Sequence, residues 1–275
     1  MNVLLTGRNG QVGSELQKLL QPTVATDHAA LDLADADAIR RVVREVKSDV
    51  IVNAAAYTAV DKAESEPELA MQVNGVAPGV LAEEAKRRGA LLVHYSTDYV
   101  FDGAKRSPYV EDDAPNPLGV YGRSKLEGEA RIRASGCRHL IIRTAWVYGW
   151  GSNFVRAILR QAEKGALLRV VNDQVGAPTW SADIASVTAG LLAARLEGTF
   201  HASAAGAASW YEVALEILRL AGRAVEVKPV STAEYGAKAP RPRYSVLDNS
   251  KLRAAGIAPI DEWRARLAVH LKSAA

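Results

Sequence analysis

The sequence predicts an α/β fold in which a doubly wound parallel sheet is joined to a smaller, interleaved C-terminal α/β domain. Two observations carry this prediction. In the first half, short runs of β-branched residues alternate with longer amphipathic stretches, a pattern typical of right-handed βαβ units. In the second half such elements recur less regularly, and no linker, repeat or low-complexity tract separates the two halves.

The predicted elements of the first half alternate along the chain. Apolar, β-branched runs predict strands over residues 3–6, 24–26, 49–53, 91–95 and 139–143. Apolar residues at helical spacing predict helices over residues 11–20, 34–47, 67–88 and 120–134. The stretch 67–88 is expected to form one or two helices, because Pro67 suits a first turn and Gly89 suits an end.

Turn residues fill the segment 98–117, and a long segment of this kind is typical of a lid or a binding loop. Beyond it, the pattern predicts strands over 168–171 and 199–202, and helices over 153–163, 182–195, 210–221 and 260–272. We therefore expect the second half to form a smaller domain packed directly on the first.

The composition is that of an ordinary globular protein, with 275 residues, 48% of them hydrophobic and 24% charged. The net charge is only +3, which favours neither a nucleic acid nor a membrane surface as a partner. Cys137 is the only cysteine, so neither an intrachain disulfide nor a thiolate zinc site is expected. The sequence shows no signal-peptide pattern and no apolar run of membrane-spanning length, and the expected location is cytoplasmic.

Three glycines at a spacing of three follow the first predicted strand and open the first predicted helix: Gly7, Gly10 and Gly13. Glycines there permit a tight turn and a close approach of backbone N–H groups to a pyrophosphate, and the helix N-terminus favours the anion. The alternative is a turn that binds nothing. The pattern predicts a Rossmann-type dinucleotide-binding domain over residues 1–148. Residues 149–275 are expected to be mainly substrate-binding, with some segments returning to the first sheet.

Two charged residues bear on the choice of cofactor. Asp27 stands 20 residues after Gly7, where an acid can bind the ribose 2′-hydroxyl and disfavours a 2′-phosphate. A helix cap or a solvated loop acid is an equal interpretation of Asp27. Arg8 lies in the turn itself and could bind a 2′-phosphate. Asp32 and Leu33 are the next candidates, for a contact at the adenine end.

A candidate acid follows the long loop. Tyr121 and Lys125 are four positions apart, so they share one face of the predicted helix. A nearby ammonium lowers the pKa of a phenol from its usual value near 10, which suits proton donation to a carbonyl oxygen as hydride reaches its carbon. Thr97 follows the fourth predicted strand, at the edge where open α/β sheets bind ligands. Its hydroxyl can hydrogen-bond the substrate carbonyl and the phenol, and a strand-end cap is its alternative role.

The order of the glycine turn, Thr97 and Tyr121-x-x-x-Lys125 resembles the extended short-chain dehydrogenases/reductases. Longer strings make the whole chain similar to the dTDP-4-dehydrorhamnose reductase family, and they occupy residues 52–64, 94–101, 143–148, 172–179 and 241–248. The resemblance implies reduction of the 4-keto group of dTDP-4-dehydro-L-rhamnose to dTDP-L-rhamnose, with NADPH or NADH. The alternatives are a reductase or epimerase of another nucleotide-linked keto sugar and a non-catalytic, nucleotide-binding regulatory subunit.

The resemblance also implies roles for individual residues. Tyr121 is the expected proton donor, Lys125 lowers its pKa and holds the nicotinamide ribose, and Thr97 and Asp98 meet the sugar. Trp146 is a further expected substrate contact. Cofactor contacts are expected at Gly10, Gln11, Val12, Asp27, Asp32, Leu33, Ala56, Tyr57, Thr58 and Tyr95.

Several assignments keep two interpretations. Asn74 matches a helix asparagine that supports the site in short-chain reductases, and a polar residue on a solvated helix face is the alternative. Arg241, with Arg243 in the same basic loop, could pair with a diphosphate through its planar fork, or the loop is simply solvated. Trp150 and Trp180 stay open between core and site, whereas the expected core residues are Phe154, Trp210 and Trp263.

A metal is implied only in part. Some relatives hold magnesium at a homodimer contact, and Glu15 matches the carboxylate that their first helix supplies. No other residue of the sequence matches the remaining ligands, since the stretch after Pro178 lacks the expected acid. The resemblance therefore leaves both Mg²⁺ and a homodimer open.

Overall fold

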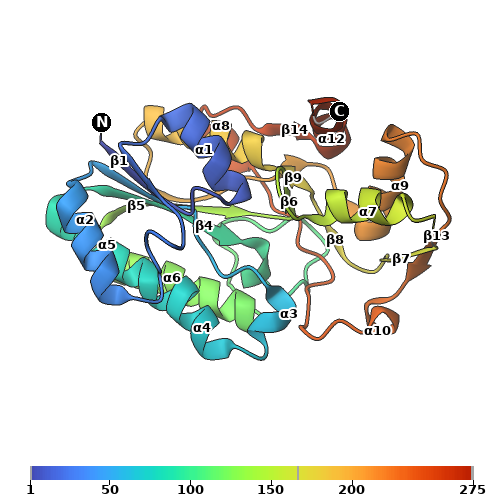
Figure 1. Ribbon diagram of the computed structural model, residues 1–275, viewed down its shortest axis with the longest axis horizontal. Coiled ribbons are helices and arrows are strands. Elements are labelled where there is room, and N and C mark those ends of the chain that lie inside the picture. Colours follow the sequence, from blue (N-terminus) through green and yellow to red (C-terminus); the bar gives the residue numbers. More distant parts are fainter. Residues whose placement is uncertain (1, 166, 274–275) are drawn as a thin grey trace.

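The computed structural model describes residues 2–165 and 167–273 and is built around one six-stranded sheet (Figure 1). The strands lie in the order β10 (Gly198–His201), β5 (Arg138–Thr144), β4 (Leu91–Thr97), β3 (Val50–Asn53), β1 (Val3–Thr6) and β2 (Val24–Thr26). Each neighbouring pair is parallel. Because β2 and β3 flank β1, the strand order reverses at β1, and the predicted doubly wound, Rossmann-type fold is confirmed.

Helices cover both faces of this sheet (Figure 1). One face carries α2 (Ala36–Val46), α5 (Ala77–Arg88) and α6 (Val120–Ser135), and the other carries α1 (Gln11–Leu20) beside α8 (Ser181–Ala193). Helix α2 shows why such segments are helical. Asp35 caps its first turn by accepting hydrogen bonds from two backbone N–H groups, and Ile39 and Val43 recur on one fully buried face.

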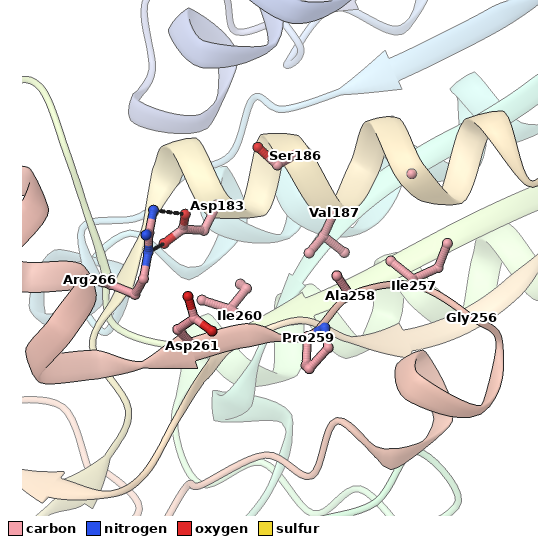
Figure 2. Close-up of a pocket in the computed structure, with 11 residues that line it drawn as sticks. Asp183, Ser186, Val187, Gly256, Ile257, Ala258, Pro259, Ile260, Asp261 and Arg266 are labelled. Carbon is pink, nitrogen blue, oxygen red and sulfur yellow. Dashed lines mark hydrogen bonds and ion pairs between the residues drawn. The ribbon is translucent and has the colours of Figure 1, made fainter.

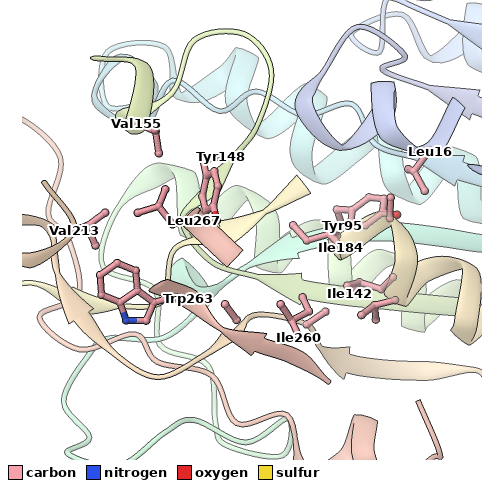
Figure 3. Close-up of a cluster of buried hydrophobic side chains, with 14 of the residues drawn as sticks. Leu16, Tyr95, Ile142, Tyr148, Val155, Ile184, Val213, Ile260, Trp263 and Leu267 are labelled. Carbon is pink, nitrogen blue, oxygen red and sulfur yellow. The ribbon is translucent and has the colours of Figure 1, made fainter. Parts of the chain in front are cut away.

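A hydrophobic cluster lies on each face of the sheet. The larger cluster joins the α1 side of the sheet to the second half of the chain and includes Trp263, which is fully buried as predicted (Figure 3). Successive residues of one strand serve different clusters: Ile51 belongs to the smaller cluster and Val52 to the larger one. A parallel sheet that is covered on both faces therefore explains the continuous apolar runs of the sequence.

Most predicted elements are present, and two of them differ in form. The stretch 67–88 divides into α4 (Pro67–Met71), a π-helical turn η1 (Gln72–Val76) and α5. The predicted closing helix over 260–272 is wrong at its start, because β14 (Ile260–Glu262) pairs with β11 (Ala204–Ala205) and α12 (Trp263–Ser273) begins only afterwards. A partner more than 50 residues away in sequence thus overrides the local helical pattern.

Side chains within the long segment 98–117 pack against one another. It opens with the 3₁₀ turn η2 (Asp98–Val100), and the ring of Phe101 stacks on that of Tyr109 with centroids 4.2 Å apart. The backbone N–H of Tyr109 donates to the Val246 carbonyl at 2.8 Å, and the Asp248 N–H donates to the Tyr109 carbonyl at 2.7 Å. This segment is therefore tied to residues 246–248 near the end of the chain.

The second half supplies short elements around the end of the main sheet. Residues beyond 149 also return to the main sheet: β10 adds a strand at its edge, and α8 packs beside α1 on one of its faces. No helix in the described part of the chain is both long enough and apolar enough to cross a membrane. The remaining elements are α3 (Val60–Ala63), β6 (Val147–Tyr148), α7 (Phe154–Ala162), β7 (Leu168–Val171), β8 (Val175–Gly176), β9 (Thr179–Trp180), β12 (Ala208–Ser209), α9 (Trp210–Leu220), β13 (Val227–Val230), α10 (Thr232–Tyr235) and α11 (Ser250–Ala254).

Candidate active site

The glycine turn joins β1 to α1 where the strand order reverses. Gly7 has a φ of 75°, and a Cβ on it would lie 2.6 Å from the backbone nitrogen of Ala55, just beyond β3. A Cβ on Gly13 would lie 2.0 Å from the Gly7 carbonyl oxygen, so α1 approaches the turn this closely only with glycine there. The Gly10 N–H closes the turn by donating to the same carbonyl at 3.0 Å. This arrangement presents the first N–H groups of α1 to an anion.

The side chains of Gln11 and Val12 are used within the protein. Gln11 donates from Nε2 to the Val147 carbonyl at 3.4 Å, and its Oε1 accepts from Asn153 Nδ2 at 3.2 Å. Val12 packs against the larger hydrophobic cluster. Their backbone N–H groups, at the open end of the helix, are what these two residues offer a phosphate.

Arg8 and Asp27, which carry opposing predictions about the cofactor, bind each other. Arg8 donates from Nη2 and Nε to Oδ2 of Asp27 at 2.7 and 3.1 Å. These hydrogen bonds are the main reason that the pKa of Asp27 is lowered. Asp27 Oδ1 also accepts from the Ala30 N–H at 3.1 Å, so it caps the following turn as well. The acid that would meet a 2′-hydroxyl is thus paired with the cation that would meet a 2′-phosphate.

The side chain of Asp32 is exposed, whereas that of Leu33 is buried. The Asp32 carboxylate is exposed, and its Oδ1 accepts a hydrogen bond from the Ala34 N–H at 2.9 Å. The Leu33 side chain is buried in the smaller hydrophobic cluster. A contact of Leu33 with adenine would therefore involve its backbone.

An amide side chain holds the segment that follows β3. Asn74 accepts from the Tyr57 N–H and donates to the Tyr57 carbonyl, both at 2.9 Å, and it also donates to Ser124 Oγ at 3.1 Å. Asn74 lies in the π-helical turn η1 and is buried, so its interpretation as a solvated polar residue is wrong. It fixes Ala56, Tyr57 and the exposed Thr58 at the carboxyl edge of the sheet, next to the glycine turn.

Tyr121 lies at the start of α6, close to the end of β4. Gly122 allows this approach, because a Cβ on it would lie 2.2 Å from the Tyr99 carbonyl oxygen. The rings of Tyr121 and Tyr99 meet edge to face with centroids 5.7 Å apart. Burial raises the pKa of Tyr121 to about 12, while the nearby Thr97 hydroxyl acts to lower it and the Asp98 carboxylate to raise it. An uncompensated phenol here is therefore a weak acid that needs a cation to activate it.

The buried carboxyl of Asp98 lies beside the Thr97 hydroxyl and near Tyr121. Its Oδ1 accepts from Thr97 Oγ1 at 3.0 Å, while its Oδ2 has no hydrogen-bond partner among the described residues. Burial raises the pKa of Asp98 to about 6, a rise that the Ser245 and Thr97 side chains limit. A buried acceptor without a partner, beside a proton donor, suits a ligand hydroxyl.

Lys125 follows Tyr121 by one helical turn and is only 2% exposed. Burial lowers the pKa of its ammonium to about 8. The structure thus gathers Thr97, Asp98, Tyr121 and Lys125 at one edge of the sheet. Tyr95 does not join them: its ring lies in the larger hydrophobic cluster, and its hydroxyl bonds to Thr188 Oγ1 at 2.7 Å.

Trp146 is held in an unusual conformation. Its φ is 45°, in the left-handed region, and its indole stacks on that of Trp210 with centroids 3.5 Å apart. A Cβ on Gly176 would lie 2.4 Å from the same indole. Trp210, expected in the core, is thus partly buried against Trp146. Trp150 is half-exposed under Arg156, whereas Trp180 and Phe154 are partly buried against the larger cluster.

Arg241 already has a partner in this structure. Its Nη2 and Nη1 donate to Oδ2 and Oδ1 of Asp61 in α3 at 2.7 and 3.1 Å. Asp61 also accepts from the Ala239 N–H at 3.0 Å, so it binds the basic loop at two points. Sequence reasoning missed Asp61, whose only signal was its place in the string 52–64. Arg243 is exposed.

The described residues do not form a magnesium site by themselves. Glu15 is buried, and both of its oxygens bind Lys18 Nζ, at 3.0 and 2.9 Å. Within residues 2–165 and 167–273, no three His, Cys, Asp or Glu side chains are grouped as a metal ion would require. The residues present therefore do not fit a metal held within one chain.

One hollow, of about 390 Å³, lies apart from these residues (Figure 2). It separates α8 from the segment 256–261, and the Asp183–Arg266 ion pair, at 2.6 Å, spans one end of it. Two of its charged side chains, Asp183 and Arg266, bind each other, and its other walls are largely aliphatic apart from Ser186 and Asp261. It therefore offers no chemistry of the kind gathered at the edge of β4.

Comparison with known proteins agrees with this geometry. The family model described as "RmlD substrate binding domain" matches residues 1–275. A dTDP-4-dehydrorhamnose reductase of Burkholderia thailandensis is 43% identical, with 96% of each chain covered. The crystal structure of a dTDP-4-dehydrorhamnose reductase from Clostridium acetobutylicum has a TM-score of 0.97 and 41% identity, and covers 100% of this chain and 99% of that one.

A second solved structure contains the cofactor. It is the dTDP-4-dehydrorhamnose reductase of Bacillus anthracis in complex with NADP, with a TM-score of 0.95, 37% identity, and coverage of 99% of this chain and 100% of that one. Sequence and structure therefore match along their full lengths. This chain belongs to the dTDP-4-dehydrorhamnose reductase family, whose model is described as the RmlD substrate binding domain.

Proposed function

We infer that this protein is an oxidoreductase that reduces the 4-keto group of dTDP-4-dehydro-L-rhamnose to give dTDP-L-rhamnose. The observation that carries the inference is the gathering of Thr97, Tyr121 and Lys125 at the carboxyl end of β4, next to the glycine turn, in a chain that matches reductases over its full length. A regulatory subunit would not need this constellation. The intact proton donor therefore favours catalysis.

In the proposed reaction, the chain supplies the proton and orients the sugar. Reduced nicotinamide, when bound, supplies hydride to C4. Tyr121 donates its phenolic proton to O4, so the carbonyl gains one hydride and one proton and becomes an alcohol. The Lys125 ammonium stabilises the phenolate that remains, and it also holds the nicotinamide ribose. The free oxygen of Asp98 is proposed to accept a hydrogen bond from a sugar hydroxyl, and the Thr97 hydroxyl to form a hydrogen bond with the sugar.

The cofactor is proposed to lie across the glycine turn, with its pyrophosphate at Gly10, Gln11 and Val12. The Arg8–Asp27 pair supports the use of both NADPH and NADH, because one partner suits a 2′-phosphate and the other a 2′-hydroxyl. Asp32 and the backbone of Leu33 are proposed to contact adenine. The segment Ala56–Thr58, held by Asn74, is proposed to line the nicotinamide half.

The remaining parts of the proposal concern the substrate side. Residues 1–148 are proposed to bind the cofactor, and residues 149–275 mainly the dTDP-sugar, with Trp146 against the sugar or base and Arg241 at the diphosphate. Every residue named in the proposed reaction comes from one chain, and a homodimer is left open. A cytoplasmic location is part of the proposal, because the reaction consumes reduced nicotinamide.

Oxidation of NADPH and NADH with a panel of nucleotide-linked 4-keto sugars tests this function. We expect turnover with dTDP-4-dehydro-L-rhamnose, and dTDP-L-rhamnose as the product identified by NMR. Faster turnover of another keto sugar would assign the protein to that substrate. Conversion of a sugar without net oxidation of the cofactor would instead identify an epimerase.

A further inference from the structure

The ammonium of Lys125 touches a buried imidazole that the reaction above does not use. Lys125 Nζ lies 3.2 Å from Nε2 of His94, and Nδ1 of His94 lies 3.1 Å from Nδ2 of Asn53. Thr6 Oγ1 in turn donates to Oδ1 of Asn53 at 2.7 Å. Thr6, Asn53 and His94 are register partners on β1, β3 and β4, so their side chains form one row across three strands. All four side chains are at most 2% exposed.

The hydrogen bonds of this row allow its protons to move together. A neutral imidazole carries one N–H. When Lys125 is an ammonium it donates to Nε2 of His94, so the hydrogen sits on Nδ1 and the Asn53 amide turns its oxygen toward it. When Lys125 is a neutral amine, its lone pair can accept, so the hydrogen can sit on Nε2 and donate to Lys125 while Nδ1 accepts from Asn53. The Thr6 hydroxyl can donate or accept, so both arrangements leave every member of the row bonded.

Burial keeps His94 neutral in both arrangements. Burial, with the charge of Lys125, holds the pKa of His94 well below its ordinary value. On α6, Glu129 favours the ammonium of Lys125, and Arg143 of β5 binds Glu129 through two hydrogen bonds. The charge of Asp98, in η2, raises the pKa of Tyr121. Among the described residues, Lys125 Nζ forms its hydrogen bond with His94 Nε2.

We propose that His94 is a positioning residue for proton donation, and that its tautomer follows the charge of Lys125. By accepting from the ammonium, His94 stabilises the charged form that activates Tyr121 and leaves the remaining N–H groups of Lys125 for the phenol and the nicotinamide ribose. By donating to the amine, it also holds the neutral form in place. The inference rests on the roles proposed above for Tyr121 and Lys125.

The tautomer can be followed directly in the wild-type protein by NMR, with ¹⁵N-labelled histidine and ¹³C-labelled lysine. Signals are assigned by their loss in His94→Gln and Lys125→Met. Between pH 6 and 10 we expect His94 to stay neutral while its N–H moves from Nδ1 to Nε2, with the same midpoint as Lys125. His201, whose Nδ1 lies 3.1 Å from the Tyr109 carbonyl, is the internal control and keeps one tautomer. A constant tautomer of His94 while Lys125 titrates would overturn the proposal.

Kinetics give a second test, with His94→Phe and His94→Gln as a matched pair. Phenylalanine keeps a flat ring but cannot accept a hydrogen bond, so the ammonium loses its partner. The alkaline limb of the kcat profile should then move about one to two pH units lower, with KM for NADPH little changed. Glutamine retains an acceptor and should restore part of the shift. An unmoved limb in both variants, or an equal loss at every pH, contradicts the proposal. The NMR result does not depend on turnover, so it stands apart from any failure of the proposed function.

Discussion

The Arg8–Asp27 contact places both determinants of cofactor choice in one ion pair. Replacing Asp27 with alanine removes the acid that suits a 2′-hydroxyl and releases Arg8 for a 2′-phosphate. We expect the ratio of kcat/KM for NADPH over that for NADH to rise about tenfold or more, the effect of one charged hydrogen bond. Steady-state kinetics with the two cofactors measure this ratio.

Arg8→Ala is the matched control for the cofactor prediction. It should move the same ratio toward NADH, because the cation is lost and the acid remains. If Asp27→Ala leaves the ratio at its wild-type value, Asp27 does not lie at the ribose, and its role is to cap the turn through Ala30.

The carboxyl of Asp98 makes stability depend on pH. Burial raises the pKa of Asp98 to about 6 from an ordinary value of 3.8, so between these values the folded protein binds more protons than the unfolded chain. Stability is therefore lost as the pH rises through this window, by roughly 3 kcal/mol in full. Asp98→Asn does not titrate, so its free energy of unfolding relative to wild type should rise between pH 5 and pH 8, by about half of that amount.

Urea unfolding of wild type and Asp98→Asn at both pH values measures this difference, since contributions from other groups cancel. A difference that is the same at pH 5 and pH 8 would mean that the pKa of Asp98 is not raised. The comparison is independent of catalysis, although the same substitution also removes a proposed substrate contact.

Sequence reasoning reached some of these residues and missed others for a physical reason. Tyr121 and Lys125 could be predicted from the sequence because a spacing of four residues on a helix is a local pattern. Thr97 could be predicted because the end of a strand is also visible in the local sequence. The pairing of Arg241 with Asp61 joins residues 180 positions apart, and no local pattern reports it. The burial of Asn74 depends on the π-helical turn and on its packing against α6.

At the scale of elements, some strands follow from local sequence and others from distant contacts. The apolar run of β1 predicts that strand, whereas β14 exists because it pairs with β11, more than 50 residues away in sequence. The basic loop 238–243 is the clearest functional case, because α3 binds it through Asp61. A dTDP-sugar brings a diphosphate that could take the place of the Asp61 carboxylate at Arg241. The loop would then exchange an internal partner for the ligand.

The exchange predicts opposite effects for the two partners. Arg241→Ala should weaken binding of dTDP by about 10- to 100-fold, the effect of losing a charged hydrogen bond, and should spare NADPH. Asp61→Ala leaves the guanidinium free, so we expect dTDP to bind at least as tightly as to wild type. Titration calorimetry with dTDP and with NADPH, separately, measures both effects. Equal weakening of dTDP in the two variants would show that the ion pair only fastens the loop.

At the scale of the whole molecule, the chain order interleaves the two proposed domains. β10 adds to the edge of β5, and α8 covers the sheet beside α1, although both come from beyond residue 149. A fragment of residues 1–148 would expose one side of the larger hydrophobic cluster. We expect it to lack a cooperative thermal transition, followed by near-UV circular dichroism beside the intact chain. A cooperative transition in the fragment would show that the first half folds alone.

The central claim is that Tyr121 donates the proton in a nicotinamide-dependent reduction, and Tyr121→Phe tests it most directly. The substitution removes one hydroxyl and keeps the ring packed on Tyr99. With dTDP-4-dehydro-L-rhamnose, we predict that kcat falls about 10²- to 10⁴-fold, the usual contribution of a general acid, while the Kd for NADPH stays within about twofold. Turnover by Tyr121→Phe within a factor of about two of wild type would contradict the account.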